Sequence, residues 1–306
     1  MKRFKEKILR FQTLRWTSQL CFFILLNAVI FGVAPVPLVL PVLHSTGTPH
    51  KTVGDAFAAI QQLLYETVFP WLPLAAFFVF AIFLGRATCS WVCPFGFVQE
   101  ILSYFKRRQM QVSPRTHQQM IYLKYLILAI VILISSTLAL SVVMGVGNSY
   151  KNALGEFGNA PFNFLSPADT LFAIVPKMVL DLRYALSEQS INAVIGGISS
   201  LSLLFWVRVV ILAAVVILAV YIPRAWCRYL CPHGAALAFL NRFSFLGLKR
   251  EAIKCTKATC RDCVQVCPMK VPILDLPWEK FTDPECIYCL KCVDACSTKA
   301  IKPKFP

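Results

Sequence analysis

Four long apolar segments constrain the fold of this chain more than any other feature of its sequence. Each is long enough to cross the hydrocarbon core of a bilayer, which takes about 20 residues of helix. The chain is 57% hydrophobic and only 15% charged, whereas soluble domains carry about 25% charged residues. This composition excludes a soluble globular enzyme, a disordered tail protein and a secreted disulfide mini-domain. The predicted spans are residues 17–43, 68–88, 122–146 and 206–226.

The first span and the region 160–205 need separate treatment. Residues 17–43 carry no charge, are too long for the apolar part of a signal peptide and lack a small-residue cleavage site, so we expect them in the mature protein. Residues 160–205 mix apolar runs with proline, glycine and charged side chains. We expect interfacial or re-entrant pieces there, packed on the helices, because irregular backbone is tolerated only where protein covers it. A fifth or sixth crossing is the alternative.

The distribution of charge predicts the orientation. Residues 1–16, 95–124 and 223–306 have net charges of +5, +4 and +7, whereas residues 44–67 and 146–205 each have −1. Basic residues accumulate on the cytoplasmic side of membrane proteins. We therefore expect a multi-pass protein of the bacterial inner (plasma) membrane with both termini in the cytoplasm. The same rule accounts for the overall charge of +16, so we predict no nucleic-acid partner.

An eleven-residue motif occurs twice. Residues 86–96 read RATCSWVCPFG and residues 224–234 read RAWCRYLCPHG, which share R-A-x-C-x3-C-P-x-G. Cysteines at i and i+4 of a helix lie on one face, the following proline ends or kinks the helix, and the glycine permits a sharp turn. Each copy is therefore expected to present two sulfurs at the cytoplasmic membrane surface. The cysteines are Cys89, Cys93, Cys227 and Cys231.

These four cysteines are our candidates for a redox site. Cofactor sites of repeated membrane proteins tend to lie between the halves, and Arg86 and Arg224 are expected to favour thiolates by lowering the cysteine pKa. A shared set of ligands for an additional metal site and a pair of thiol–disulfide couples both remain open. We favour a shared redox site over the alternative in which each motif separately has only a structural role at the end of its helix.

The C-terminal region carries two runs of four cysteines. Their spacing is close to the paired C-x2-C-x2-C-x3-C runs of two-cluster bacterial ferredoxins, in which the fourth cysteine of each run ligates the other cluster. This pattern predicts two [4Fe-4S] clusters. Cluster 1 takes Cys255, Cys260, Cys263 and Cys296, and cluster 2 takes Cys286, Cys289, Cys292 and Cys267.

The first run departs from the standard spacing. Four residues separate Cys255 from Cys260, where two are usual, so a three-iron cluster without Cys255 is the alternative. Pairs of the form C-x2-C also bind zinc, but eight cysteines with this spacing favour iron–sulfur. A disulfide framework is disfavoured, because the charge pattern places this region in a reducing compartment.

Together these features predict an α-helical membrane protein. We expect a four-helix transmembrane bundle built from two repeated halves, with a C-terminal cytoplasmic bacterial-type two-cluster ferredoxin domain of the α+β class. The predicted divisions are a basic cytoplasmic N-terminus (residues 1–16), a four-span membrane domain (17–240) and a ferredoxin domain (241–306). The four histidines, His44, His50, His117 and His233, form no i, i+4 pair, which argues against a bis-histidine haem. His233 is expected either near the motif sulfurs or at the surface.

The cysteine motifs resemble those of the NapH/MauN family of ferredoxin-type membrane proteins. The matching stretches are CSWVCP at 89–94, C-x3-C-P-x-G-A at 227–235 and CVDACS at 292–297, and the likeness is greatest to the NapH group, the quinol dehydrogenase membrane subunits of periplasmic nitrate reductase systems. The resemblance implies oxidation of membrane quinol and electron delivery through [4Fe-4S] clusters to partner iron–sulfur or cytochrome redox subunits. MauN-type maturation proteins, NosR-type regulators and CcoG-type copper reductases share the motifs. A metal (copper) reductase or redox-enzyme maturation factor is therefore the alternative function.

Overall fold

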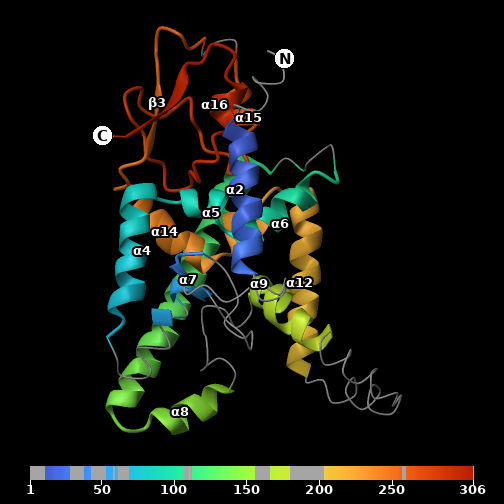
Figure 1. Cartoon of the computed structure of the whole chain (residues 1–306), viewed down its shortest axis with the longest axis vertical. Helices are drawn as coiled ribbons and strands as arrows, with labels where there is room; N and C mark the ends of the chain where they lie inside the picture. Colours follow the sequence, from blue (N-terminus) through green and yellow to red (C-terminus); the bar gives the residue numbers. More distant parts are fainter. Residues whose placement is uncertain are drawn as a thin grey trace.

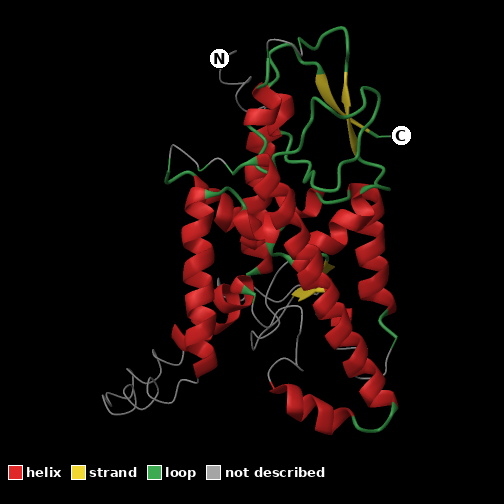
Figure 2. Cartoon of the chain, turned by 180° about the vertical axis from the view of Figure 1, so that it is seen from behind, coloured by secondary structure: helices red, strands yellow, loops and turns green. Residues whose placement is uncertain are grey.

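The computed structural model describes residues 11–27, 38–42, 53–57, 59–60, 69–106, 110, 112–155, 166–179, 203–256 and 260–305. A set of helices forms the body, and a small region containing strands caps one end of it (Figures 1 and 2). In chain order the elements are α2 (Phe11–Leu26), β1 (Leu38–Leu40), β2 (Val53–Asp55), α4 (Trp71–Leu84), α5 (Ala87–Trp91), α6 (Pro94–Ser103), α7 (Pro114–Val143), α8 (Gly147–Leu154), α9 (Pro167–Asp169), the π-helical η2 (Thr170–Ile174), α12 (Leu203–Tyr221), α13 (Ala225–Tyr229), α14 (Pro232–Asn241), β3 (Gly247–Arg250), α15 (Asp262–Gln265), α16 (Lys291–Ala295) and β4 (Ile301–Lys304).

Two helices of the described part are long and apolar enough to span a membrane. These are α7 with 30 residues and α12 with 19. Both expose most of their apolar side chains, as helices surrounded by lipid do. The helix α4 is apolar but has 14 residues. The arrangement agrees with a membrane protein, and the four crossings remain a prediction.

The first predicted span is wrong as an unbroken helix over residues 17–43. The helix α2 begins at Phe11 and ends at Leu26, and Leu38–Leu40 form the strand β1, which pairs in parallel with β2. Prolines at positions 35, 37 and 41 disfavour a helix around β1, because a proline in a helix interior removes a hydrogen bond and clashes with the preceding turn.

The start of α7 follows a local signal that precedes the apolar run. Ser113 caps the helix by accepting a hydrogen bond from the Thr116 backbone N–H at 3.2 Å, and Pro114 occupies its first position. Both residues are favoured at these places. The helix therefore begins eight residues before the predicted span, with its first two turns carrying polar side chains.

Part of the doubtful region 160–205 packs on a long helix. The short helix α9 and the π-helix η2 contact α12, and Ala168, Phe172 and Ala173 are buried there. Asp169 forms an ion pair with Arg208 of α12 at 3.5 Å. Residues 166–179 therefore form a piece packed on α12, and residues 180–202 lie outside the described residues.

The C-terminal region, residues 247–305, folds against the helices as a closed unit that we call the tail. Its first and last strands, β3 and β4, pair antiparallel, with Leu248 opposite Pro303. Its core contains Met269, Ile273 and Phe281 together with Ala87 of α5. The tail and the first motif therefore share one hydrophobic core, which fixes where the tail cysteines lie relative to the membrane domain.

Candidate redox site

Each repeated motif folds into two short helices separated by its second cysteine. Cys93 has extended backbone angles between α5 and α6, and Pro94 opens α6. Cys231 is likewise extended between α13 and α14, and Pro232 opens α14. The prediction that both cysteines of a motif share one helix face is therefore wrong. The physical reason is the proline, which favours the first position of a new helix and disfavours α conformation in the residue before it.

The arginine of each motif reaches into the other motif. Arg224 Nη1 donates to the carbonyl oxygen of Cys89 at 2.8 Å, and Arg86 Nη2 donates to the carbonyl oxygen of Cys227 at 3.3 Å. Both arginine side chains are buried. The two motifs, far apart in the sequence, therefore form a single unit with a local two-fold relation.

The motif glycines leave room for this crossing. A Cβ at Gly96 would lie 2.8 Å from the Cys89 oxygen and 3.2 Å from Arg224 Nη1, and a Cβ at Gly234 would lie 3.2 Å from Arg86 Nη2. Both glycines lie inside helices. Their predicted role in a sharp turn is therefore wrong, and their role is to permit the close approach of the partner motif.

The four motif cysteines meet where the two motifs cross. Cys93, Cys227 and Cys231 are buried and Cys89 is half-buried. Burial raises the pKa of the Cys231 thiol well above its ordinary value, and the sulfurs of Cys227, Cys89 and Cys93 act in the same direction. Burial also raises the pKa of Cys227, against the opposing charge of Arg224. For the free thiols of Cys227 and Cys231, the prediction that the arginines lower the pKa is therefore wrong, because desolvation outweighs the neighbouring charge.

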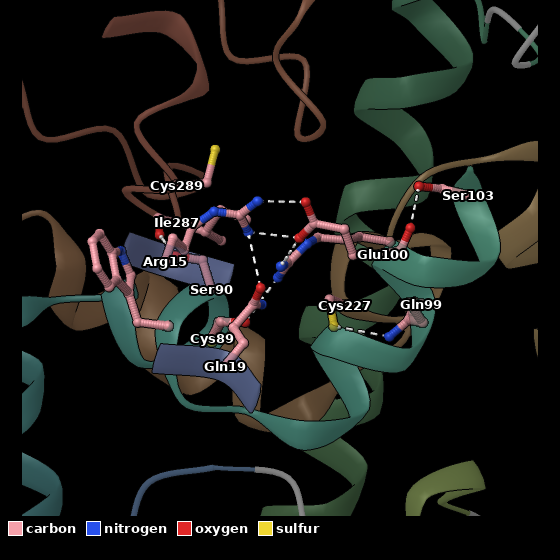
Figure 3. A network of polar contacts seen from close by, with 12 residues as sticks. Arg15, Gln19, Cys89, Ser90, Gln99, Glu100, Ser103, Cys227, Ile287 and Cys289 are labelled. Carbon is pink, nitrogen blue, oxygen red and sulfur yellow. Dashed lines mark hydrogen bonds and ion pairs between the residues drawn. The ribbon is translucent and has the colours of Figure 1, made fainter. Parts of the chain in front are cut away.

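Two N–H donors point at the motif sulfurs. Gly234 N donates to Cys231 Sγ at 3.3 Å. Gln99 Nε2 donates to Cys227 Sγ at 3.1 Å (Figure 3). Gln99 also accepts from the Trp226 backbone N–H at 3.1 Å, so α6 of the first half positions a sulfur of the second. Among the described residues no group of three or more His, Cys, Asp or Glu side chains is arranged around a single metal ion.

A buried carboxylate joins the second motif to α2 and the tail. Glu100 of α6 accepts a hydrogen bond from Arg15 at 2.6 Å (Figure 3). It also accepts one from Arg224 at 2.8 Å and pairs with Lys291 of the tail at 2.9 Å. Burial alone would raise the pKa of Glu100, but the Arg15 hydrogen bond and the charges of Arg224 and Lys291 hold it well below its usual range. Sequence reasoning missed this network, because its members come from four separate segments.

A second buried carboxylate joins the first motif to the tail. Glu285 of the tail pairs with Arg86 at 2.9 Å and with Lys124 of α7, and Tyr125 donates to its Oε1 at 3.2 Å. Burial opposes ionisation here too, but Arg86 and Lys124 lower the pKa of Glu285. Each motif arginine is therefore held by one carboxylate, which keeps it aimed at the opposite motif.

The first motif, together with α2 and the end of α14, holds the tail segment that carries the second cysteine run. Ser90 Oγ donates to the Ile287 oxygen at 2.6 Å and Trp91 Nε1 to the Tyr288 oxygen at 3.0 Å. Asn241, at the end of α14, donates to the Cys286 oxygen at 3.1 Å. Gln12 of α2 adds a bond to the Cys289 oxygen at 2.8 Å. This cysteine run therefore lies directly against the crossed motifs.

The four cysteines predicted for cluster 2 line one small cavity. Apolar side chains of the tail core form the rest of its wall. Burial raises the pKa of the Cys292 thiol well above its usual value, and the sulfurs of the other three members raise it further. The cavity is lined by Cys267, Cys286, Cys289 and Cys292.

Cys263 lies among the other cysteines predicted for cluster 1. Burial raises the pKa of its thiol, a bond from the Val264 N–H opposes this, and the sulfurs of Cys255, Cys260 and Cys296 raise it again. Cys255 therefore lies near Cys263 despite its wider spacing in the sequence. The structure brings the members of each set together, and the assignment of each cysteine as a ligand stays a prediction.

The backbone around these cysteines suits an anionic iron–sulfur group. Among the described residues, five non-glycine residues have positive φ, and four of them follow a tail cysteine within three positions: Lys270, Tyr288, Leu290 and Lys299. Left-handed residues in such turns direct successive N–H groups inward, as in known iron–sulfur sites. The Ala300 N–H donates to Cys296 Sγ at 3.2 Å. Cysteines grouped in two sets, with N–H donors on Cys263 and Cys296, suit iron–sulfur clusters, and the number of clusters stays a prediction.

Two of the four histidines, His117 and His233, lie among the described residues. His233 is buried and meets the Phe57 ring edge-on at 4.4 Å, so its predicted alternative at the surface is wrong. His117 Nδ1 lies 3.0 Å from the Tyr229 hydroxyl and 3.0 Å from Arg228. His44 and His50 lie outside the described residues.

Comparison with known sequences points to the same two halves. A family described as a 4Fe-4S binding domain matches residues 67–110 and 204–251, which are the two copies of the repeated motif with their preceding helices. No solved structure matches the chain significantly. The family match therefore falls on the crossed motifs as well as on the start of the tail.

Three curated relatives share much of the chain at low identity. The ferredoxin-type protein NapH of Escherichia coli is 24% identical over 283 residues, covering 89% of this chain and 75% of NapH. The methylamine utilization ferredoxin-type protein MauN of Methylobacillus flagellatus is 27% identical over 258 residues, covering 82% and 75%. The putative electron transport protein YccM of Escherichia coli is 27% identical over 252 residues, covering 78% of this chain and 59% of YccM.

Proposed function

Because this chain belongs to the family of NapH- and MauN-like ferredoxin-type proteins, we propose that it is a membrane electron-transfer protein that oxidises quinol and delivers electrons to partner redox subunits. The respiratory chain of periplasmic nitrate reductase type is the setting we propose. The observation that carries the proposal is the attachment of the second cysteine run to the first motif through Ser90 and Trp91, and to the end of α14, the helix that continues from the second motif, through Asn241. Such contact is what a protein needs to pass electrons from the membrane to a tail on its surface.

The tail cysteines hold the cofactors in this proposal. Cysteine thiolates at these spacings hold [4Fe-4S] clusters, which supply one-electron carriers when bound. We assign one cluster to Cys255, Cys260, Cys263 and Cys296, and the other to Cys286, Cys289, Cys292 and Cys267. The second set faces the motifs, and three members of the first set are only half-buried. The first set is therefore the one that a partner subunit can approach.

The buried polar network keeps the tail in this position. Glu100 binds Lys291 of the tail, and Glu285 of the tail binds Arg86 of the first motif. Glu100 is 2% exposed and Arg86 is fully buried, and removing the partner of a buried charge leaves that charge without compensation. The network therefore fixes the distance between the motifs and the second cysteine set.

The crossed motifs form a shared redox site in this proposal. Their four cysteines come from two halves, yet each half positions groups of the other through Arg86, Arg224 and Gln99. Replacing Cys93 or Cys231 by Ser should abolish quinol-linked electron transfer and leave both tail clusters assembled. Cys21, an exposed cysteine outside the motifs, provides the control, and its replacement by Ser should have no effect. Full activity in the Cys93 or Cys231 variant would show that the motif has only a structural role, as the place where one helix ends and the next begins.

Reduction of the tail clusters by quinol tests the function itself. The full-length protein in lipid nanodiscs is mixed without oxygen with decylubiquinol or menadiol, and cluster reduction is followed by absorbance and EPR. We expect reduction by at least one quinol, with dithionite giving the full extent. If dithionite alone reduces the clusters, the quinol proposal is refuted. Copper bound to the chain and lost on replacing Cys89 or Cys227 would then favour the metal reductase.

A further inference from the structure

A long apolar cavity lies beside the motif junction on the lipid-facing side of the helices. It has a volume of about 1160 Å³ and lies between α4, α7 and α14, with Phe57, Ile60 and Phe69 closing one side. Its wall consists mainly of Phe, Leu, Ile and Ala side chains. An apolar cavity of this size is large enough for a drug-sized or larger ligand.

The cavity follows α7 for most of the thickness of a membrane. Its lining positions on this helix run from Tyr125 to Val143, which is a rise of about 27 Å at 1.5 Å per residue. The hydrocarbon core of a bilayer is about 30 Å thick. The space therefore suits a ligand with a long apolar chain oriented along the membrane normal.

The end of the cavity nearest the tail carries a polar group. Tyr125 lines the cavity, and its hydroxyl donates to Glu285 Oε1 at 3.2 Å. Since its proton is committed to Glu285, the tyrosine oxygen has lone pairs left for another donor. A hydroxyl group on a ligand can supply that donor, whereas a carbonyl group cannot.

The same tyrosine lies next to the second cysteine set. Glu285 directly precedes Cys286, which lines the cysteine cavity of the tail. Arg86 and Lys124 hold the other Glu285 oxygen, so the glutamate is fixed between the apolar cavity and the tail. A ligand ring at Tyr125 is therefore connected to Cys286 of the second set through Tyr125 and Glu285.

We infer that this cavity is the quinol site, with the ring hydroxyl donating to Tyr125 and the isoprenoid chain extended along α7 toward Val143. The inference rests on the proposed function and adds the place and the residues that bind. It commits to the reduced form as the tighter ligand, because only quinol brings a hydroxyl donor to the Tyr125 oxygen. The acyl chain of a phospholipid, which would also fill an apolar cavity, is the rival occupant.

Photolabelling tests the location independently of activity. An azido-substituted ubiquinone analogue is irradiated with the full-length protein in nanodiscs, and labelled peptides are identified by mass spectrometry. We expect the label on α7 between Tyr125 and Val143 or on α14, with competition by decylubiquinol. Label elsewhere, or label displaced by added phospholipid but not by decylubiquinol, overturns the inference.

Substitutions within and beside the cavity sharpen the test. Ala139→Phe fills the cavity from α7, and we expect it to lose most of the labelling and to raise the KM for decylubiquinol in the cluster-reduction assay. Ala129→Phe is the matched control, because Ala129 is an exposed residue of the same helix outside the cavity. If the two variants behave alike, the cavity is not the site.

Tyr125→Phe tests the polar end. Loss of one hydrogen bond to a neutral group should raise the KM for decylubiquinol by about threefold to tenfold, and should change competition by decylubiquinone much less. If the substitution weakens the binding of decylubiquinol and of decylubiquinone equally, Tyr125 does not accept a hydrogen bond from the quinol hydroxyl. If the cavity is labelled but quinol does not reduce the clusters, the cavity binds quinol and the proposed function is refuted. If quinol reduces the clusters but the label lies elsewhere, the proposed function is supported and the cavity is not the quinol site.

Discussion

Replacing Glu100 by Gln should destabilise the whole protein and loosen its tail. The carboxylate is 2% exposed and binds Arg15, Arg224 and Lys291. Gln keeps the shape but removes the negative charge that these three cations share. Removing one partner of a buried ion pair costs about 3–5 kcal/mol. At roughly 2–4 °C per kcal/mol for chains of about 150–250 residues, the unfolding midpoint should fall on the order of 10 °C.

The measurement compares thermal unfolding of the full-length protein in detergent with that of a surface control. Glu251→Gln removes a carboxylate that also binds two lysines, Lys254 at 2.6 Å and Lys302 at 2.8 Å, but at the protein surface. Exposed pairs contribute little because solvent screens them, so its midpoint should stay near that of the wild type. Equal shifts in the two variants would refute the claim that the Glu100 network docks the tail.

The pH dependence follows from the low pKa of Glu100. A carboxyl whose pKa is lowered by folding stabilises the protein fully above its unfolded pKa of about 4.3 and progressively less as pH falls below it. The difference between wild type and Glu100→Gln should therefore stay constant from about pH 8 to pH 6 and shrink only in strong acid, by the same linkage. A difference that vanishes near neutral pH would contradict the ion-pair geometry.

Three further predictions concern the motifs, the displaced cysteine and the topology. Gly96→Ala should impair motif packing more than Gly234→Ala, because the new Cβ would lie 2.8 Å from a backbone oxygen at position 96 but no closer than 3.2 Å to any atom at position 234. The thermal unfolding midpoint of the Gly96 variant should therefore be the lower of the two. Cys255→Ala should change the EPR spectrum of the reduced protein, and an unchanged spectrum would show that Cys255 is not a ligand. Reporter fusions after residues 55, 112, 175 and 300 should read outside, cytoplasm, outside and cytoplasm, and a cytoplasmic result at 175 would mean that the region 160–205 crosses the membrane.

Local patterns in the sequence predicted the parts of the site that depend on neighbouring residues. The repeat identified the two motifs, and the spacing grouped the tail cysteines. The prolines predicted that the helix of each motif is interrupted, although the interruption lies before Cys93 and Cys231 and not after them. The crossing of Arg86 and Arg224 was not predictable, because it depends on how two distant motifs pack. The role of the motif glycines was missed for the same reason.

The N-terminal helix shows why charge alone misplaces a boundary. An arginine inside an apolar helix is costly, so the sequence favours a span that begins after Arg15. The structure begins α2 at Phe11 and buries Arg15 against Glu100, a partner 85 residues away. No local pattern marks that pair, since an ion pair between distant segments exists only in the folded chain.

Two [4Fe-4S] clusters in the tail, reducible by quinol, are the property on which the proposed function depends. The most direct measurement combines iron analysis with EPR of the full-length protein in nanodiscs, first reduced by dithionite and then, in a separate sample, by decylubiquinol or menadiol. We predict about eight iron atoms in the tail, two magnetically interacting signals, and the same signals with at least one quinol. Zinc in place of iron, a single cluster, or signals that appear with dithionite but with neither quinol would contradict it.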